Sequence, residues 1–462
     1  MQFDIADRDL RDAATAVARD VREAGGRALV VGGSVRDALL GLEIRDVDLE
    51  VFGVAPDRLR SLIGSRFAVD LVGESFAVLK VKGLAMDISL PRRDSKRHPG
   101  HRGFHVEADP EMHPREAAAR RDFTVNAMSI DLAGGQLIDF FGGARDLERR
   151  VLRHIDNRFG EDPLRVLRAM QFAGRLGATL DRATAALCRE LSPDELPDER
   201  VFDEWAKLLL RADRPSRGLA VLDETGWIRA FPELDALRGC PQDPEWHPEG
   251  DVFVHTGHVL DAFAAERVGD EWEDLVVGFA CLAHDFGKPA TTEFAEGRWR
   301  SHGHDTAGLV PARSFLERMS APVSLRDQVL PLVGDHLAPS LLRRAGASAA
   351  AVRRLAVRVE RIDRLVRVAR ADQAGRPPLP WDGFPAGDWL TDMATDLDVV
   401  DERPRPIVMG RHLIDVLGLE PGPEFGPLLQ AAFDAQVDGT INNLDEGLEL
   451  IRGLRGEPPS SR

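Results

Sequence analysis

Hydrophobic and polar positions near the N-terminus predict a strand, a short helix and a second strand. Residues 28–31 form an apolar run of the length expected for a buried strand. The next two residues are glycines, which permit a tight turn, and Ser34 is a favourable N-cap for a helix that runs through Leu40. Gly41 can end this helix, and the second strand is expected at residues 46–51.

The second predicted strand places three acidic side chains on one face. Successive strand residues point to opposite faces, so Asp46, Asp48 and Glu50 share a face while valine and leucine occupy the other. Carboxylates two residues apart have Cα atoms about 6–7 Å apart, which suits divalent cations that bridge phosphate oxygens. Asp46 and Asp48 are therefore candidate metal ligands, although an Asp-x-Asp pair is also common in acidic chains.

The same pattern continues with one helix and three strands that complete a small mixed sheet. The helix is expected at residues 56–63, and the strands at residues 67–72, 77–81 and 85–90. Asp87 in the last strand is a candidate third metal ligand. The alternative is an edge-strand aspartate that faces water.

A longer helix is predicted at residues 161–177, where apolar residues recur on one face. Asp162 and Arg165 are three residues apart and therefore share the opposite side of this helix. A purely local role is also open, because Asp162 before Pro163 suits a helix N-cap followed by proline at the first helical position. Glu161 is an alternative cap that would leave Asp162 for another role.

Beyond residue 215 the chain reads mostly as amphipathic helices with breaks such as residues 241–248. Four residues there form a candidate metal site of imidazoles and carboxylates. This mixed nitrogen and oxygen set suits a transition metal such as Mn²⁺, Ni²⁺ or Fe²⁺ better than the oxygen shell that Mg²⁺ prefers. The four are His255, His284, Asp285 and Asp372, and His304 and His336 are further candidates.

Composition indicates a globular chain of roughly three or four domains, with 462 residues of which 43% are hydrophobic. A net charge of −17 argues against a protein that coats nucleic acid. Basic stretches at residues 91–102, 149–177 and 341–370 leave an RNA partner open, although arginines on helices more often lie on solvated faces.

Three scattered cysteines and the lack of a long apolar window predict a cytoplasmic protein that does not enter a membrane. Cys188, Cys240 and Cys281 form no CxxC pair, so neither a disulfide framework nor a cysteine zinc site is expected. The sequence leaves the oligomeric state open.

The order strand, GGSVRD, helix, strand with Asp-x-Asp resembles the nucleotidyltransferase signature of class II tRNA CCA-adding enzymes and bacterial poly(A) polymerases. Residues 120–132, RRDFTVNAMSIDL, resemble the second motif of this family, and residues 138–152, IDFFGGARDLERRVL, resemble the third. The loop at residues 95–113 is too long for an ordinary connection. It corresponds to the family's flexible loop used in the final A addition, and it looks full length here.

The resemblance implies a nucleotide site and a role for several of its residues. Arg121, with Arg120 beside it, would neutralise triphosphate oxygens, and Asp122 would accept a hydrogen bond from the ribose 2′-hydroxyl. Asp162 and Arg165 match the EDxxR motif that reads the incoming base. The implied nucleotide-binding residues are Gly33, Arg36, Arg121, Asp122, Asn126, Asp162, Arg165 and Arg168. Residues 199–210 resemble the neck helix that supports this motif, with Glu204 as its internal partner.

A carboxylate beside a guanidinium can distinguish the bases without an RNA template. Cytosine and adenine each present an exocyclic amine donor next to a ring-nitrogen acceptor, whereas uracil and guanine present a carbonyl next to a ring N–H. The pair would therefore accept CTP and ATP and reject UTP and GTP, since a wrong base leaves buried polar groups mispaired.

The second half of the chain resembles an HD-type phosphohydrolase domain, through the strings HPEGDVFVHTGHVL and LAHDFGK. The implied fold is α+β: a polymerase-β-like nucleotidyltransferase head with a small mixed sheet, followed by an all-α neck, HD-type body and RNA-supporting tail. The expected boundaries are residues 1–148 for the head, 149–214 for the neck, 215–400 for the body and 401–462 for the tail.

The expected activity is addition of C, C and A to the 3′ end of tRNA from CTP and ATP, with Mg²⁺ in the head. Metal-dependent phosphohydrolase activity is expected in the body. An enzyme that adds only A remains an alternative, as does a poly(A) polymerase, although the chain has LVGESFAVLKV where that class has a basic LIGRRF-like string. The alternative from another class is an HD phosphohydrolase whose head binds nucleotide or RNA without catalysis.

Overall fold

The computed structural model describes residues 5–72, 78–96, 104–194 and 196–456. The chain divides into two compact units. The N-terminal unit comprises Met1–Glu204 and Arg217–Ala230, and the C-terminal unit comprises Trp205–Ser216 and Phe231–Arg462. The expected division of the chain into head, neck, body and tail is finer than these two units, and it stays a prediction.

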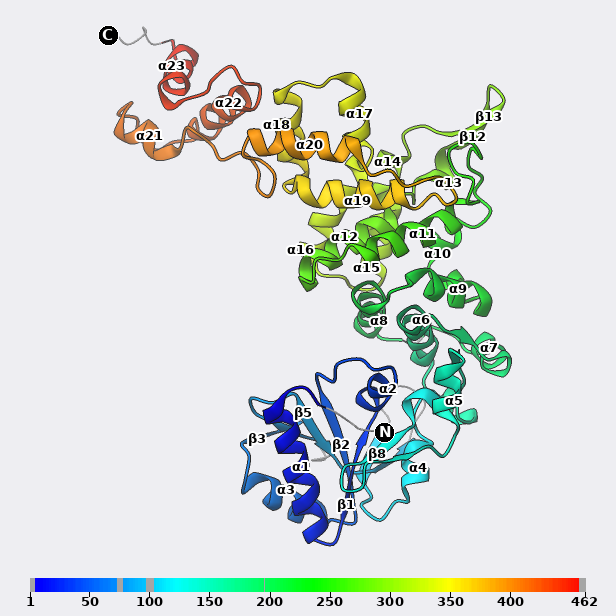
Figure 1. The fold of residues 1–462 in the computed structure, drawn as a ribbon. Coiled ribbons are helices and arrows are strands. Elements are labelled where there is room, and N and C mark those ends of the chain that lie inside the picture. The colour runs from blue at the N-terminus through cyan, green and yellow to red at the C-terminus, as the bar shows by residue number, and fades with distance from the viewer. Residues whose placement is uncertain (1–4, 73–77, 97–103, 195, 457–462) are drawn as a thin grey trace. The chain divides into compact units, whose positions relative to one another are not determined.

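The N-terminal unit begins with a mixed sheet and its covering helices and ends in helices (Figure 1). Its first elements are α1 (Arg8–Glu23), β1 (Arg27–Val31), α2 (Gly33–Leu39), β2 (Val47–Phe52), α3 (Pro56–Gly64), β3 (Val69–Val72), β4 (Val78–Val81), β5 (Met86–Ser89), β6 (Arg92–Lys96), β7 (Phe104–Ala108), α4 (Pro114–Ala118), η1 (Thr124–Asn126), β8 (Ser129–Asp131) and β9 (Gln136–Ile138). The next are α5 (Gly143–Glu148), β10 (Val151–Leu152), η2 (Asn157–Glu161), α6 (Leu164–Leu176), β11 (Thr179–Leu180), α7 (Arg182–Arg189), α9 (Pro215–Thr225) and η3 (Trp227–Ala230). Helix α8 (Asp198–Arg211) begins in the N-terminal unit and continues into the C-terminal unit.

The C-terminal unit is helical apart from one β-hairpin. Its elements are α10 (Pro232–Asp235), α11 (Val252–Ala265), α12 (Glu271–Ala283), α13 (Lys288–Thr291), β12 (Thr292–Ala295), β13 (Arg298–Ser301), α14 (His304–Ala307), α15 (Leu309–Arg318), α16 (Val323–Asp335), α17 (Ala338–Ala345), α18 (Ala349–Val359), α19 (Ile362–Ala374), α20 (Pro385–Asp396), α21 (Gly410–Asp415), α22 (Phe425–Val437) and α23 (Leu444–Leu454).

The main sheet has seven strands in the order β3-β4-β5-β2-β1-β8-β9. β2 runs parallel to β5 and antiparallel to β1. In this register Asp48 lies opposite both Val31 and Asp87. The sheet therefore brings two predicted metal ligands to adjacent positions, and Asp87 lies between two paired strands rather than on the edge strand of the alternative interpretation.

Helix α1 shows how the sequence builds the first layer on this sheet. The Asp7 side chain caps the helix by accepting a hydrogen bond from the Leu10 N–H at 3.0 Å. Apolar side chains then recur every three to four residues, and those that become buried are Leu10, Ala13, Ala14, Val17, Ala18 and Val21. In Figure 1, α1 and α3 lie together against one face of the sheet.

Most predicted elements near the first motif are present, with three corrections. The helix after the Gly-Gly turn has Gly32 at its N-cap, so the predicted Ser34 cap is wrong, because Ser34 is buried inside α2. The acidic strand starts at Val47, so Asp46 precedes it. The segment 95–113 contains strand β7 and the end of β6, which pair as an antiparallel hairpin, while residues 97–103 lie outside the described ranges.

The predicted mixed-sheet head followed by a helical remainder is confirmed. Two short two-stranded sheets, β10–β11 and β12–β13, interrupt the part predicted to be all-α. Residues 73–77, which belong to the string LVGESFAVLKV, lie outside the described part of the chain.

Packing in the C-terminal unit is dominated by α11, α12, α16 and α19, which contact one another across the helical body (Figure 1). An aromatic cluster supports this core: Trp205 is fully buried and lies edge-on to Phe231 and Phe315, with ring centroids 5.2 and 5.3 Å away. These packed helices can hold side chains at their ends in fixed positions.

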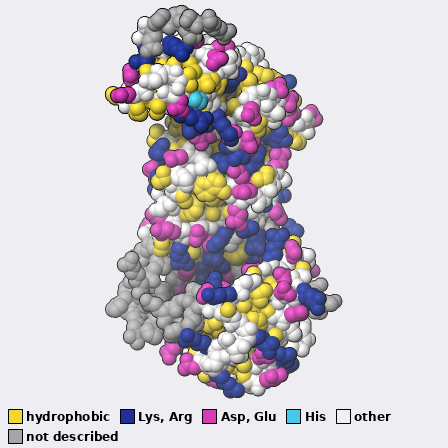
Figure 2. Space-filling model, turned by 90° about the vertical axis from the view of Figure 1, so that its left-hand side faces the viewer, with side chains coloured by type: hydrophobic (Ala, Val, Ile, Leu, Met, Phe, Trp, Pro, Cys, Tyr) yellow, Lys and Arg dark blue, Asp and Glu magenta, His cyan; other side chains and the backbone are white. Residues whose placement is uncertain are grey.

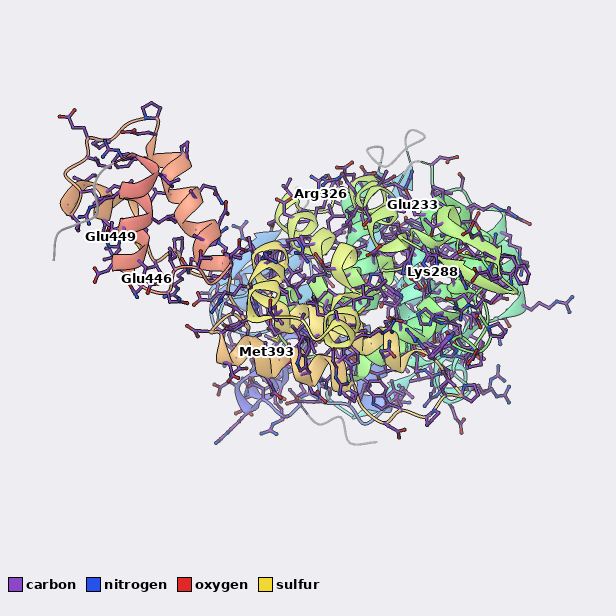
Figure 3. All side chains as sticks on the ribbon, turned by 90° about the horizontal axis from the view of Figure 1, so that it is seen from above. Glu233, Lys288, Arg326, Met393, Glu446 and Glu449 are labelled. Carbon is purple, nitrogen blue, oxygen red and sulfur yellow. The ribbon has the colours of Figure 1, made fainter. Side chains whose placement is uncertain are left out.

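The last three helices have a small core of their own, which includes Leu413, Leu428 and Ile451. Glu446 and Glu449 of α23 are labelled in Figure 3, where Lys288 lies instead among the helices of the body. Asn443 caps α23 by accepting from the Glu446 N–H at 3.0 Å.

Charged side chains of both signs are interspersed over the face drawn in Figure 2. Among the described residues, no helix combines the length and the apolar character needed to cross a bilayer.

Candidate functional sites

The first candidate site lies where β1 and β2 meet the Gly-Gly turn. Asp48 and Asp87 are half-buried neighbours in the sheet, and Asp46 is exposed just before β2. Burial raises the pKa of Asp48, repulsion from Asp46 adds to this effect, and Arg121 opposes it. A divalent cation would relieve the repulsion that these carboxylates exert on one another.

Gly32 allows the close approach of groups from three segments. Its φ is +77°, and a Cβ atom there would lie 3.1 Å from Nη1 of Arg121 and 3.6 Å from Oδ2 of Asp48. The turn therefore brings the second-motif guanidinium next to the first-motif carboxylate. Gly33, the first residue of α2, lies beside Arg36.

The carboxylates of this site are accessible and do not form a closed set of ligands around one point. Asp87 forms an ion pair with Lys80 at 3.4 Å. Among the residues that the structure describes, every group of three or more potential ligands within 4.8 Å of one another lies in the C-terminal unit. An open set of carboxylates suits Mg²⁺, which usually keeps waters and binds substrate phosphates in addition to one or two protein carboxylates.

Four predicted nucleotide-binding residues form one connected hydrogen-bond network in the described structure. Buried Arg36 donates to Oδ1 of Asn126 at 2.7 Å, and the Asn126 amide donates to Oδ1 of Asp122 at 2.9 Å. Arg168 donates to Oδ2 of Asp122 at 2.7 Å. Burial would raise the pKa of Asp122, but Arg168 and Asn126 outweigh burial and lower it.

Phe172 of α6 lies between the two arginines of this network. The Arg36 guanidinium is 5.1 Å and the Arg168 guanidinium 5.3 Å from its ring centroid, which fits cation–π contact. Asp37 also belongs to the network, because its carboxylate accepts from Arg36 at 2.9 Å and from Arg175 at 2.8 Å. Sequence reasoning missed Asp37, although it ends the GGSVRD string.

Asp162 and Arg165 lie near one another but each has other partners. Asp162 accepts from the Leu164 N–H at 3.1 Å and from Arg200 at 3.0 Å, so it has the local capping contact, and Glu161 is exposed. Arg165 donates to the backbone carbonyl oxygens of Arg158 and Arg120 at 2.8 and 2.9 Å. Glu204, the predicted neck partner, is buried and lies 3.9 Å from Arg168.

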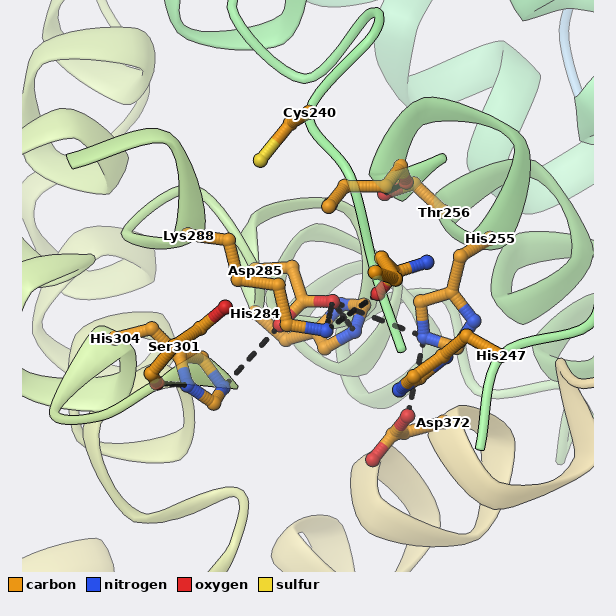
Figure 4. Close-up of polar contacts among 12 residues, drawn as sticks. Cys240, His247, His255, Thr256, His284, Asp285, Lys288, Ser301, His304 and Asp372 are labelled. Carbon is orange, nitrogen blue, oxygen red and sulfur yellow. Dashed lines mark hydrogen bonds and ion pairs between the residues drawn. The ribbon is translucent and has the colours of Figure 1, made fainter. Parts of the chain in front are cut away.

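The second candidate site brings all six predicted residues of the C-terminal unit together, and Figure 4 labels five of them, His255, His284, Asp285, His304 and Asp372. Asp285 is central: its Oδ2 lies 3.1 Å from Nε2 of His284 and 3.8 Å from Nε2 of His255, and its Oδ1 lies 3.3 Å from Nε2 of His304. The ends of five helices, α11, α12, α14, α16 and α19, supply the six predicted residues. The two ligand groups around Asp285 are His255, His284 and Asp285, and Asp285, His304 and His336.

Hydrogen bonds fix the ring orientation of three histidines. The Nδ1 atoms of His284, His304 and His336 each lie 2.7 Å from the carbonyl oxygen three residues earlier. Each Nδ1 must therefore carry the proton, which leaves the Nε2 lone pair available as a metal ligand. Nε2 of His304 and Nε2 of His336 are only 3.2 Å apart, an arrangement that a shared cation would stabilise.

Electrostatics at this site also favour a cation. Burial lowers the pKa of His336 to about 4, and the neighbouring His284 and His304 contribute. Burial would raise the pKa of Asp285, but His284 and Lys288 lower it well below its usual value. Nε2 of His284 is buried without a hydrogen-bond partner among the described residues, and Oδ2 of Asp285 is buried beside it and forms an ion pair with Lys288 at 2.7 Å.

A supporting group behind His255 was missed from the sequence. Glu249 is fully buried, and its Oε1 lies 2.7 Å from Nδ1 of His255 and 2.9 Å from Nδ1 of His247. Nε2 of His255 lies 3.1 Å from Asp372. A carboxylate that holds the far nitrogen of a histidine is a frequent partner of metal ligands, and the HPEGD string was the available signal.

Comparison with known proteins now identifies the family. A model described as the poly A polymerase head domain matches residues 28–153, and one described as a probable RNA and SrmB- binding site of polymerase A matches residues 177–238. A multifunctional CCA protein from Xanthomonas campestris is 39% identical over 380 residues, 78% of this chain and 88% of the relative. The chain belongs to the multifunctional CCA protein family. A member from Laribacter hongkongensis is 38% identical over 372 residues, 78% of this chain and 87% of the relative.

Solved CCA-adding enzymes share the fold. The enzyme of Bacillus stearothermophilus, solved in complex with CTP, superposes with a TM-score of 0.66 at 22% identity and covers 97% of this chain and 99% of that chain. The Thermotoga maritima enzyme, solved with tRNA, superposes with a TM-score of 0.57 at 19% identity and covers 97% and 96%.

Membership in the CCA protein family identifies the chain as a nucleotidyltransferase that depends on a divalent metal. It leaves the role of each site residue to the geometry. In this chain the acidic strand, the second motif and the network around Asp122 lie in the N-terminal unit, and the six predicted histidine and aspartate ligands lie in the C-terminal unit.

Proposed function

We propose that the chain adds C, C and A to the 3′ end of tRNA from CTP and ATP. The observation that carries this proposal is the convergence of Asp48, Asp87 and Arg121 at the Gly32 turn. Carboxylates that can hold a cation lie there beside a guanidinium that can bind a triphosphate. A cytoplasmic location is part of the proposal, and it agrees with three cysteines that are free thiols.

In the proposed reaction the 3′-hydroxyl oxygen of tRNA attacks the α-phosphorus, a new phosphodiester bond forms, and pyrophosphate leaves with the electrons of the broken P–O bond. Asp46 and Asp48, with Asp87 as a third candidate, would hold Mg²⁺, which supplies charge neutralisation at the phosphates. Arg121 would bind the triphosphate, and Arg36 would hold Asn126 and Asp122 in place.

Base choice is proposed to depend on Asp162 and Arg165 at the start of α6. Arg165 is held by two backbone carbonyls, so its guanidinium has a fixed orientation. Asp162 is anchored by Arg200 and the helix N-terminus and keeps partial exposure. Asp122 is proposed to favour NTP over dNTP, either by contact with the ribose or by orienting Arg168.

One assay tests this function and separates its alternatives. The purified chain is given tRNA that ends before CCA, after C, or after CC, with each NTP supplied singly. CCA addition predicts C on the first two substrates and a single A on the third. Extension only of the CC-ended substrate would indicate an A-adding enzyme, and long A tracts would indicate a poly(A) polymerase. No incorporation would support a head that only binds nucleotide or RNA.

We further propose that the C-terminal unit is a metal-dependent phosphohydrolase of the HD type. His255, His284, Asp285 and Asp372, with His304 and His336, would hold a transition metal such as Mn²⁺, Ni²⁺ or Fe²⁺. Nε2 of His284, which is buried without a hydrogen-bond partner among the described residues, fits such an ion. The metal would supply activation of water against a phosphate ester. Terminal or 2′,3′-cyclic phosphates on RNA are suitable targets, because they block the 3′-hydroxyl that the head requires.

A further inference from the structure

Asp37, the last residue of the GGSVRD string, joins two arginines that lie on different helices. Its Oδ1 accepts from Nε and Nη2 of Arg36 at 3.0 and 2.9 Å, and its Oδ2 accepts from Nη2 of Arg175 at 2.8 Å. Arg36 precedes Asp37 in α2, whereas Arg175 lies near the C-terminal end of α6. The carboxylate of Asp37 therefore links these two helices through both of its oxygens.

One face of α6 is attached at two points to the segments that carry the nucleotide-binding residues. Arg168, Phe172 and Arg175 follow one another at intervals of four and three residues, so they share this face. Arg168 donates to Asp122 of the second motif, and Arg175 donates to Asp37 of α2. The two attachments are about two helical turns apart, or about 10 Å. Together they fix the rotation of α6 about its axis, which a single attachment would not do.

Asp37 also balances a buried charge. The side chain of Arg36 is only 2% exposed. Burial lowers the pKa of Arg36, the carboxylate of Asp37 opposes this effect, and repulsion from Arg175 adds to it. Loss of the charge on Asp37 would leave two guanidinium groups that repel each other, one of them buried without its salt-bridge partner, which is strongly unfavourable. The position of Arg36 therefore depends on Asp37.

The position of Arg36 in turn decides which end of the Asn126 amide faces Asp122. Nη1 of Arg36 donates to the amide oxygen of Asn126 at 2.7 Å, and a guanidinium can only donate. The amide nitrogen then points the other way and donates to Oδ1 of Asp122 at 2.9 Å. This hydrogen bond holds the Asp122 carboxylate in one orientation.

We propose that Asp37 is a positioning residue that makes the nucleotide site selective for a ribose. It holds Arg36, and the hydrogen bonds through Asn126 then fix the carboxylate of Asp122. The inference rests on the proposed nucleotide addition and on the proposed role of Asp122 in the choice of NTP over dNTP. Rejection of a nucleotide that lacks one hydroxyl requires a well-placed partner for that hydroxyl, so this selectivity is the property most sensitive to the orientation of Asp122.

The test compares CTP with dCTP on tRNA that ends before CCA. The value of kcat/KM is measured for each nucleotide with the parent, Asp37→Asn, Arg175→Ala and the double variant. Asp37→Asn is expected to lower the ratio of the CTP value to the dCTP value about tenfold or more. Arg175→Ala is expected to lower this ratio by a smaller factor, because Arg36 keeps its partner. The double variant should match Asp37→Asn, since both changes break the same bridge.

The ratio separates positioning from a merely structural role. A loss of folded protein lowers both kcat/KM values by the same factor and leaves their ratio unchanged. Asp20→Asn is the matched control, because Asp20 also accepts from the arginine before it, Arg19, and from a second arginine, Arg66, at 2.8 Å. Its side chain is 15% exposed, against 16% for Asp37, but it lies on α1 outside the network. This variant is expected to keep the parent ratio.

A parent ratio in folded Asp37→Asn, from a parent that adds C, would overturn the inference and leave the proposed function intact. A double variant with a clearly lower ratio than Asp37→Asn would contradict the shared bridge. A parent that adds no C would reject the proposed function, and this inference with it.

Discussion

At the scale of single residues, the N-terminal site depends on placing like charges together. Asp48 lies beside Asp87 in the sheet, and Asp46 raises its pKa by repulsion in addition to the larger effect of burial. Such an arrangement costs stability when no cation is bound, and it is therefore consistent with the proposed metal site.

Asp48→Ala is expected to lower nucleotide addition at least about 100-fold, since it removes a charge-stabilising group from the reacting phosphates. The fold should persist, because the Asp48 side chain is only half-buried and contributes little to the apolar core. Incorporation of labelled CTP is measured on tRNA that ends before CCA, with circular dichroism as the check on folding. Glu43→Gln, an exposed acid outside the site, is the control. Parent-like incorporation by folded Asp48→Ala would remove Asp48 from the site.

Asp48→Asn is expected to raise the melting temperature of the metal-free protein at neutral pH. The folded-state pKa of Asp48 is raised, so its ionised form is disfavoured by folding, and this penalty is present above the folded pKa and disappears as the pH falls below the unfolded value. The asparagine variant should therefore be more stable at pH 7 in EDTA and equal to the parent near pH 3. Calorimetry at both pH values measures this difference. Excess Mg²⁺ at pH 7 should favour the parent, if Asp48 binds the ion.

At the scale of elements, the sequence predicted the strands and helices well and their exact ends less well. The apolar runs at β1 and β2 and the apolar face of α6 came from periodicity, which burial enforces. The N-cap of α2 was predicted wrongly, because Ser34 is an excellent local cap but the glycine turn starts the helix two residues earlier. The β6–β7 hairpin was missed, because β6 contains no apolar residue, although apolar and polar residues alternate in β7.

Asp162 at the start of α6 has the local capping contact, because it accepts from the Leu164 N–H, and it also pairs with Arg200. A role of Asp162 in base reading stays a prediction. Asp162→Ala is expected to cost about 1 kcal/mol of stability through loss of the cap. Arg165→Ala leaves this cap in place and removes the guanidinium that is proposed to contact the incoming base together with Asp162.

Both variants are expected to incorporate UTP or GTP, measured as the ratio of correct to incorrect nucleotide on tRNA that ends before CCA. Arg182→Ala, on α7, serves as the arginine control. If both variants keep the parent ratio, base reading does not depend on this pair, and Asp162 is only a helix cap.

At the scale of the whole chain, the two sites use different chemistry in different units. Carboxylates open to solvent characterise the predicted N-terminal site, and buried imidazoles with carboxylates characterise the predicted C-terminal one. The C-terminal site residues could be predicted by residue type, yet the roles of Glu249 and Lys288 could not be assigned without the fold. Glu249 contacts His255, and Lys288 contacts Asp285, only in the folded chain.

This separation predicts that the two activities can be removed independently. His284→Ala takes away a buried ligand of the Asp285 cluster and should abolish phosphate release from 2′,3′-cyclic and 3′-phosphate RNA ends in Mn²⁺ or Ni²⁺, with loss of bound transition metal by elemental analysis. Mg²⁺-dependent CTP addition to tRNA with a free 3′-hydroxyl should remain within about twofold of the parent, since changes at sites that share no partner residues are usually independent. His258→Ala, on α11 but outside the cluster, is the histidine control and should keep both activities. The cluster would be structural if His284→Ala hydrolysed the phosphates at the parent rate, or if the parent bound no transition metal. Loss of both activities together would show that the two units are coupled.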